Sequence, residues 1–195
     1  MDMSINSKII DKKTALEKAS DLIAKIKSGA IFIYPTDTIY GIGCDATNKN
    51  SVIKIREIKQ RAEQPFSVIA PNKGWIWENC KITSDEQKDI DQKLPGNYTF
   101  FIETLKSNSV SSAINPSENN STLGVRIPKH WFTEIVQTSN TPFVTTSVNI
   151  TGGKFMNDLP DLDIAIIEKV DIIVYDGPGS GHVSEKIDLR KNKLV

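Results

Sequence analysis

Residues 31–48 read IFIYPTDTIYGIGCDATN, and this stretch gives the clearest indication of the fold. Its first four residues, 31–34, are apolar and favour a β-strand, which Pro35 ends. Threonines, an aspartate and glycines follow, and they predict a turn rich in hydroxyl groups. Ligands of open α/β sheets bind at such strand ends. The residues are equally typical of an ordinary turn whose Thr and Asp side chains satisfy its own backbone.

The composition narrows the class of protein. The chain has 195 residues, and we expect a single domain over 1–195. Lys+Arg and Asp+Glu both number 24, so the net charge is zero. That balance weakly disfavours bulk attraction to nucleic acid, although a local basic patch is compatible with it. The chain has no apolar run of membrane-spanning length and no signal peptide, and its two cysteines favour a reducing cytoplasm.

The cysteines and histidines suggest little chemistry. Cys44, Cys80, His130 and His182 do not have the spacing of metal ligands. A catalytic His–Cys pair would have to form through the tertiary fold, which the sequence does not indicate. Cys44 is therefore more typical of a packing residue than of a nucleophile.

Helices and strands alternate along the chain, which indicates an α/β fold. A T-x-x-E pair, Thr14 and Glu17, predicts the start of the first helix, and Gly29 ends it. Further helices are expected to begin near residues 50, 72, 84, 130 and 161. Strands are expected over 31–34, 67–70, 98–105, 123–126, 143–147, 172–175 and 186–189. Because only a polar loop joins 98–105 to 123–126, we expect these two strands to pair antiparallel in a mixed, twisted open sheet.

Two cations, Lys59 and Arg61, lie at the end of the second expected helix. Such a pair is usually a solvated helix end that suits the helix dipole. Residues i and i+2 point to different sides of a helix but to the same side of an extended segment. The pair can therefore grip one anion only if the helix ends near Lys59.

Two strands carry polar residues of interest. Ser147 and Asn149 share one face if residues 145–149 are extended, but they could equally form a turn before the glycines that follow. Arg126 lies inside an apolar strand. If it is buried it needs a partner, whereas on an edge strand it would face water.

Together these segments resemble one family. PTDTIYG, KQR, PFSVIAP, LPG-x-x-TF, VRIP, SVN-x-TG and SEKID occur between about Ala15 and Leu189 in the order seen in YrdC-type threonylcarbamoyl-AMP synthases. The resemblance implies a twisted α/β sheet with flanking helices around a large, concave, positively charged cavity. The chain resembles the short, single-domain form of the family.

The resemblance also implies a reaction. L-Threonine, bicarbonate or CO2 and ATP would become L-threonylcarbamoyladenylate and pyrophosphate, with ATP acting as nucleotidyl donor. Mg²⁺ would come with ATP, with no metal ligand from the protein. A tRNA-modifying transferase complex would use the product to make N6-threonylcarbamoyladenosine at tRNA position 37. The alternatives are a module that binds double-stranded RNA or tRNA without catalysis, and a paralogue with different chemistry.

Such phosphoryl transfer depends on positioning and charge neutralisation, so no side-chain nucleophile is needed. Lys59 and Arg61 match the family's catalytic cations and would hold the triphosphate. The resemblance completes the ATP site with three polar residues, Thr122, Ser147 and Asn149. It builds the L-threonine site from Arg126, which would pair with the carboxylate, and from Thr36, Tyr40 and Thr145.

The end of the chain is expected to contribute a lid. Residues 177–181 read GPGSG, which is the composition either of a mobile lid or of a plain surface linker. The resemblance places Ser184 and Asp188 near the cavity. The chain departs from the family at Asn97, Ile69 and Phe155, so we assign no ligand contact to the last two and expect a looser turn at Asn97.

Overall fold

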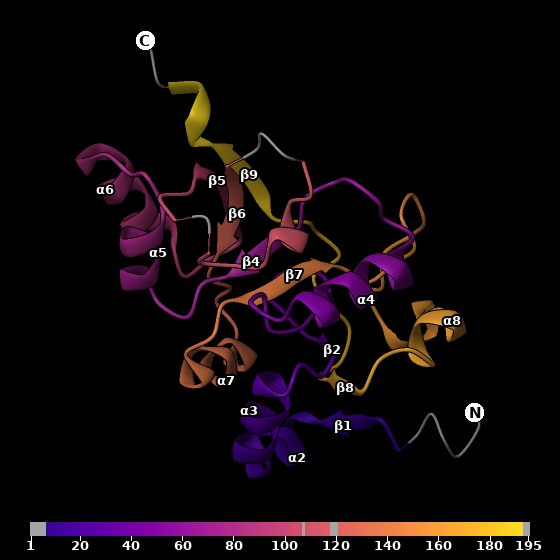
Figure 1. Cartoon of the computed structure of the whole chain (residues 1–195). Helices are drawn as coiled ribbons and strands as arrows, with labels where there is room; N and C mark the ends of the chain where they lie inside the picture. Colours follow the sequence, from indigo (N-terminus) through magenta and orange to yellow (C-terminus); the bar gives the residue numbers. More distant parts are fainter. Residues whose placement is uncertain (1–6, 107, 118–120, 193–195) are drawn as a thin grey trace.

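Helices flank both faces of a sheet in the computed structural model, which describes residues 7–106, 108–117 and 121–192 (Figure 1). The described strands are β1 (Ile9–Asp11), β2 (Phe32–Tyr34), β3 (Gly41–Gly43), β4 (Ser67–Ile69), β5 (Tyr98–Glu103), β6 (Thr122–Arg126), β7 (Phe143–Ser147), β8 (Ile172–Tyr175) and β9 (Glu185–Asp188). The described α-helices are α2 (Lys12–Glu17), α3 (Ala19–Lys27), α4 (Lys49–Lys59), α5 (Lys73–Asn79), α6 (Ser84–Lys93), α7 (Trp131–Ser139) and α8 (Ile164–Ile167). Short 3-10 turns lie at Ser112–Ile114, Leu159–Asp161 and Leu189–Asn192.

The strands of the described chain form one nine-stranded sheet in the order β1-β8-β2-β3-β7-β4-β6-β5-β9. Strand β8 runs parallel to β1 and β2, β4 runs parallel to β6, and β5 runs parallel to β9. The remaining neighbours are antiparallel, and they include the β5–β6 pair that the polar loop predicts. The sheet is therefore mixed and open, as predicted.

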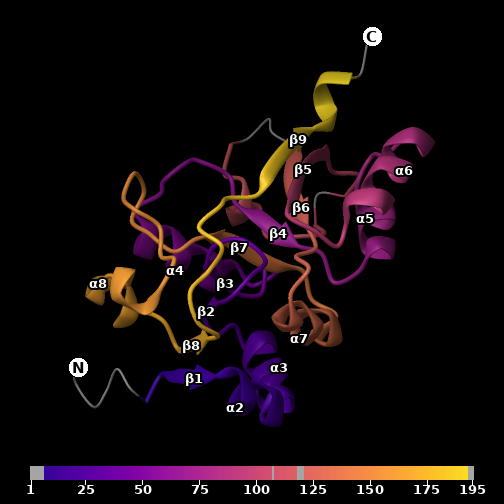
Figure 2. The ribbon, with the colours of Figure 1, turned by 180° about the vertical axis from the view of Figure 1, so that it is seen from behind.

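The two faces of the sheet bury different helices. Phe32 and Tyr34 of β2 pack with α2, α3 and α7 on one face, whereas Ile33 packs with α4 and α8 on the other. This alternation follows from the two-residue period of a strand. Figure 2 shows α3 and α7 together beside β2, with α5 and α6 at the far end of the sheet near β5. The chain thus builds one core on each face.

The start of the first helix differs from the prediction. Asp11 is the N-cap, and its carboxylate accepts from the backbone N–H of Thr14 (2.8 Å), so Thr14 lies inside the helix. The T-x-x-E capping box is wrong because a better acceptor precedes it by three residues. The helix also breaks at Lys18 into α2 and α3.

The end of α4 meets the condition set by the sequence. The helix stops at Lys59, and Gln60 takes a left-handed conformation with φ 48°. Its backbone N–H donates to Glu57 O (3.1 Å), as in other left-handed helix ends. Arg61 therefore lies outside the helix, whereas Lys59 is its last residue. No helix in the described part of the chain combines the length and apolar character needed to cross a membrane.

Candidate functional site

A cavity of about 330 Å³ opens on the sheet face that carries α3 and α7. Seven residues predicted for the site line it, namely Thr36, Tyr40, Arg61, Arg126, Thr145, Ser147 and Ser184. The lining also includes residues that we did not predict, among them Thr38, Ser67, Thr99, Thr146 and Lys186. Its charged side chains, Arg61, Arg126 and Lys186, are all cations. The cavity is therefore suited to anionic groups.

Glycine creates the space at the floor of the cavity. Gly124 lies between Ser67 of β4 and Phe101 of β5 in the ladder, and both neighbours line the cavity. A Cβ atom on Gly124 would come within 2.3 Å of the Ser67 hydroxyl oxygen. Gly41 is similar, because its Cβ would lie 2.7 Å from the buried ring of Tyr34. Small residues at these positions keep the floor open.

The loop 35–40 between β2 and β3 holds the threonines of the PTDTIYG motif. The Thr36 hydroxyl donates to Ile39 O (2.7 Å) and accepts from the backbone N–H of Thr38 (3.0 Å). The Tyr40 hydroxyl donates to Gly177 O (2.6 Å) and accepts from the Asp176 N–H (3.0 Å). Both hydroxyls therefore serve the structure of their own loops while the side chains line the cavity. The proposed contact of Thr36 with threonine stays a prediction.

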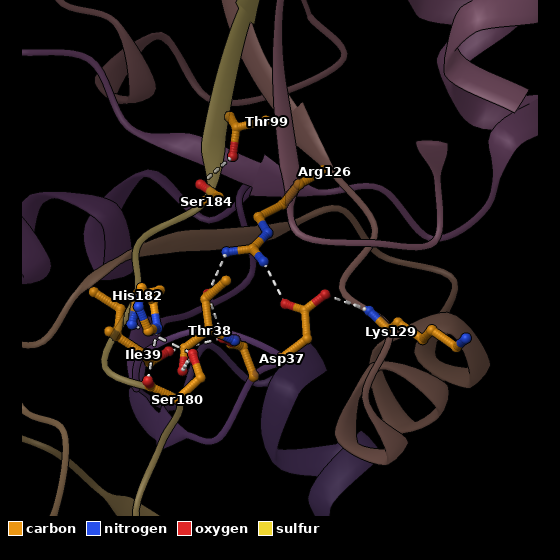
Figure 3. Close-up of polar contacts among 10 residues, drawn as sticks. Asp37, Thr38, Ile39, Thr99, Arg126, Lys129, Ser180, His182 and Ser184 are labelled. Atoms are coloured by element: carbon orange, nitrogen blue, oxygen red, sulfur yellow. Dashed lines mark hydrogen bonds and ion pairs between the residues drawn. The ribbon is translucent and has the colours of Figure 1, made fainter. Parts of the chain in front are cut away.

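Arg126 lies at the end of β6 and is buried, so it does need partners. Its Nη2 donates to Asp37 Oδ1 (2.6 Å), and its Nη1 donates to Thr38 Oγ1 (3.3 Å) (Figure 3). Its Nε is buried without a hydrogen-bond partner among the described residues. Burial lowers the pKa of Arg126, and Asp37 opposes that shift. A buried guanidinium with a free N–H is a donor available to a carboxylate ligand.

Lys59 is 1% exposed and lies behind the cavity rather than in its lining. Its ammonium donates to Ser147 O, to Asn149 O (2.9 Å) and to Asn149 Oδ1 (3.0 Å). Burial, with a further contribution from Arg61, lowers the pKa of Lys59 to about 7. In this state Lys59 holds the S-x-N segment, and direct contact with triphosphate stays a prediction.

Ser147 and Asn149 are brought together, although β7 ends at Ser147 and residues 148–150 form a bend instead of continuing extended. The Ser147 hydroxyl donates to Asn149 Oδ1 (2.6 Å), and Asn149 Nδ2 donates to Gly153 O (2.8 Å). Ser147 lines the cavity, but Asn149 is not among the described lining residues. Arg61 reaches the same wall, and its Nη2 donates to Pro65 O (2.7 Å). Arg61 and Ser147 are thus the members of the predicted ATP set that the cavity exposes.

Thr122 lies at the other end of β6 from Arg126. Alternate residues share a face, so Thr122, Gly124 and Arg126 point to the same side, with about 13 Å between the first and the last. The Thr122 hydroxyl accepts from Arg190 Nη1 (3.1 Å), and Arg190 also pairs with Asp188 (2.6 Å). Thr122 is outside the lining of this cavity. Its nucleotide contact stays a prediction.

The segment 177–184 passes along one side of the cavity and is tied to it (Figure 3). The Ser180 backbone N–H and hydroxyl both donate to Thr38 O (3.0 and 3.1 Å). The Ser184 hydroxyl pairs with that of Thr99 (2.8 Å). Asp188 faces the same side of the sheet as Phe101, its partner in β5. The placement of Ser184 at the cavity supports its proposed role, whereas a lid movement is untested.

The departures from the family pattern and the cysteines have structural places. Ile69 is fully buried in the core, and Phe155 is half-buried. The carbonyl of Asn97 accepts from the Glu185 N–H (2.9 Å), which ties that turn to β9. Cys44 and Cys80 are buried, and burial raises both thiol pKa values, that of Cys80 to about 12. Inert thiols agree with a packing role. The described residues contain no group of three or more His, Cys, Asp or Glu that could hold a metal ion.

A protein-family model for Sua5, YciO and YrdC, described as telomere recombination, matches residues 24–194. The chain belongs to the Sua5/YciO/YrdC family. It is 30% identical over 181 residues to a putative threonylcarbamoyl-AMP synthase of Methanocaldococcus jannaschii, a match that covers 88% of this chain and 82% of the relative.

Two further proteins are similar to the chain, one in sequence and one in fold. It is 25% identical over 173 residues to the uncharacterized protein YciO of Escherichia coli, with 87% of this chain and 82% of YciO covered. Its fold matches the crystal structure of P. abyssi Sua5 complexed with L-threonine, with a TM-score of 0.81 at 22% identity. That match covers 93% of this chain but only 54% of the Sua5 chain, so this chain spans about half of that protein.

Proposed function

We propose that this protein is an L-threonylcarbamoyladenylate synthase. Its substrates would be L-threonine, bicarbonate or CO2 and ATP, and its products threonylcarbamoyl-AMP and pyrophosphate. The relative from M. jannaschii carries this name as a putative assignment, and the Sua5 structure was determined with L-threonine. The observation that carries the proposal is the cavity itself. It is lined by Arg126 at the end of β6, by Arg61 after α4 and by Ser147 at the end of β7, beside β3.

The N–H groups of Arg126 that Asp37 and Thr38 leave unused would bind the carboxylate of L-threonine. This contact would leave the amino group to take up CO2 as a carbamate. Thr145 and Thr36 line the same cavity as Arg126 and would contact the threonine side chain. The carbamate oxygen would then attack the α-phosphorus of ATP, and pyrophosphate would leave.

Arg61 would neutralise charge that develops on the phosphates, since a guanidinium can hold two phosphate oxygens at once. Ser147 would donate to a phosphate oxygen, with Asn149 and Lys59 holding it in place. Thr122 would contact the nucleotide further along β6. Mg²⁺ would arrive with ATP, held by phosphate oxygens and water, and would neutralise the leaving pyrophosphate. The product would pass to a transferase complex that modifies tRNA in the cytoplasm.

The test is pyrophosphate release by the purified protein with ATP, bicarbonate and L-threonine. Release should require all three substrates, and threonylcarbamoyl-AMP should appear in equal amount by mass spectrometry. Arg126→Gln should abolish the L-threonine-dependent release because a neutral amide cannot form an ion pair with the carboxylate. Pyrophosphate release that is independent of L-threonine would refute the proposal.

A second candidate is a paralogue with different chemistry, because the chain is also similar to YciO, an uncharacterized protein. The same cavity would then hold an acid other than L-threonine at Arg126. A panel of amino acids and hydroxy acids in the pyrophosphate assay separates the two candidates. A module that only binds double-stranded RNA or tRNA would release no pyrophosphate with any of them.

A further inference from the structure

Asp37, in the middle of the PTDTIYG motif, makes contacts that its position in the sequence does not suggest. Its Oδ1 accepts from Arg126 Nη2 (2.6 Å), and its Oδ2 accepts from the Lys129 backbone N–H (2.8 Å) (Figure 3). The Asp37 side chain is 13% exposed and that of Arg126 is 8% exposed. Both carboxylate oxygens are therefore occupied inside the protein.

Asp37 lies beside the cavity rather than in its lining, whereas Arg126 and Thr38 do line it. A guanidinium has five N–H groups in one plane. Asp37 and Thr38 take up one on each terminal nitrogen, and the Nε–H has no partner among the described residues. The contacts thus hold both terminal nitrogens in place and leave the other N–H groups of the guanidinium for a ligand.

We propose that Asp37 is a positioning residue for Arg126, which it holds so that the unused N–H groups of the guanidinium can bind the amino-acid carboxylate. The inference rests on the proposed function, because it takes L-threonine as the ligand. Lys129 fixes Asp37 in turn, since its N–H belongs to the segment that leads into α7. The Asp37–Arg126 ion pair joins the β2–β3 loop to the end of β6, and neither β2 nor β3 is a neighbour of β6 in the sheet.

Two effects of removing the Asp37 charge oppose each other. A less compensated Arg126 would attract a carboxylate more strongly, but a released guanidinium would lose its fixed fork. Positioning should win, because a bidentate contact needs both N–H groups in the right plane. Asp37→Asn keeps the size and one acceptor while removing the charge. We expect the Kd and the KM for L-threonine to rise about tenfold or more, with those for ATP within about twofold of the wild type.

Asp45→Asn is the matched control. Asp45 is also a buried aspartate, but its Oδ1 accepts from the N–H and hydroxyl of Thr47 (both 2.7 Å), away from the cavity lining. The Kd values of the Asp45→Asn variant for L-threonine and for ATP should stay within about twofold of the wild type. Calorimetry with L-threonine, and separately with ATP, gives the Kd values, and pyrophosphate release gives KM and kcat.

The outcomes separate the two ideas. If the wild type binds L-threonine and Asp37→Asn binds it equally or more tightly, Asp37 does not position Arg126, and the proposed function stands. If Asp37→Asn weakens L-threonine and ATP alike, the residue only supports the fold, and the inference fails. If the wild type neither binds L-threonine nor releases pyrophosphate with it, the proposed function fails and takes the inference with it.

Discussion

Replacing Lys59 with methionine tests whether its ammonium anchors the segment 147–149. The Lys59 ammonium donates to three oxygens of the 147–149 segment. Hydrogen bonds from a charged donor contribute about 1.5–3 kcal/mol each, or about 4.5–9 kcal/mol for three. Burial and the nearby Arg61 oppose this contribution and lower the pKa of Lys59 to about 7. Methionine would leave the buried acceptors unpaired, at a cost of about 1–3 kcal/mol, and we expect Lys59→Met to be less stable by about 2 kcal/mol near neutral pH.

Lys59→Met should therefore lower Tm by about 4–8 °C in a domain of this size. Lys54→Met is the control, because Lys54 is exposed on the same helix and should change Tm by no more than about 2 °C. Turnover of Lys59→Met should fall by about 100-fold, since Ser147 and Asn149 lose their anchor. Differential scanning calorimetry and pyrophosphate release measure the two effects.

The stability that Lys59 contributes should depend on pH. Its pKa is lower in the folded protein than in the unfolded chain, so between pH 7 and about 10 the unfolded chain binds the extra proton. The stability gap between wild type and Lys59→Met should then widen from pH 7 to pH 9, by at most about 1.4 kcal/mol per pH unit. A Tm that rises on substitution at both pH values, with full turnover, would refute the anchoring role.

Three other predictions concern the cavity. L-Valine should support much slower pyrophosphate release than L-threonine, because the Thr36 side of the pocket would read a hydroxyl that valine lacks; equal rates would remove that assignment. Backbone amides of residues 177–184 should become protected from hydrogen exchange when ATP and L-threonine bind together, and unchanged exchange would make the segment a linker. Gly124→Ala should raise the KM for substrates at least tenfold with a Tm loss of about 2–12 °C, because its methyl group would meet Ser67; an unchanged KM would mean that ligands do not reach the cavity floor.

Much of the fold could be predicted because its strands are short apolar runs ended by proline or glycine. The strand 143–147 was predicted at its observed bounds, and the antiparallel β5–β6 pair followed from the helix-free loop between them. Strand β3 was missed because Gly41 and Gly43 carry no side-chain pattern. They form a strand because they pair with β2 on one side and with β7 on the other.

The site could be predicted only where a strand or turn delivers its residues locally. Ser147 and Asn149 meet in the bend that follows β7, which agrees with the turn that the sequence left open rather than with extended geometry. The inward direction of Lys59 could not be foreseen, because it depends on where the chain turns at Gln60. The partner of Arg126 was also hidden, since Asp37 lies 89 positions away and no periodic pattern links a loop to a non-neighbouring strand.

Thr38 links the amino-acid end of the cavity to the segment 177–184. Its hydroxyl accepts from Arg126, and its carbonyl accepts twice from Ser180. A ligand that draws the Arg126 guanidinium toward itself would weaken the long contact to Thr38 (3.3 Å) and leave the two bonds to Ser180 in place. Thr38 and the segment 177–184 would then be free to move together toward the bound ligands. Ordering of residues 177–184 should therefore depend on the ligand at Arg126, and ATP alone should protect them less than ATP with L-threonine.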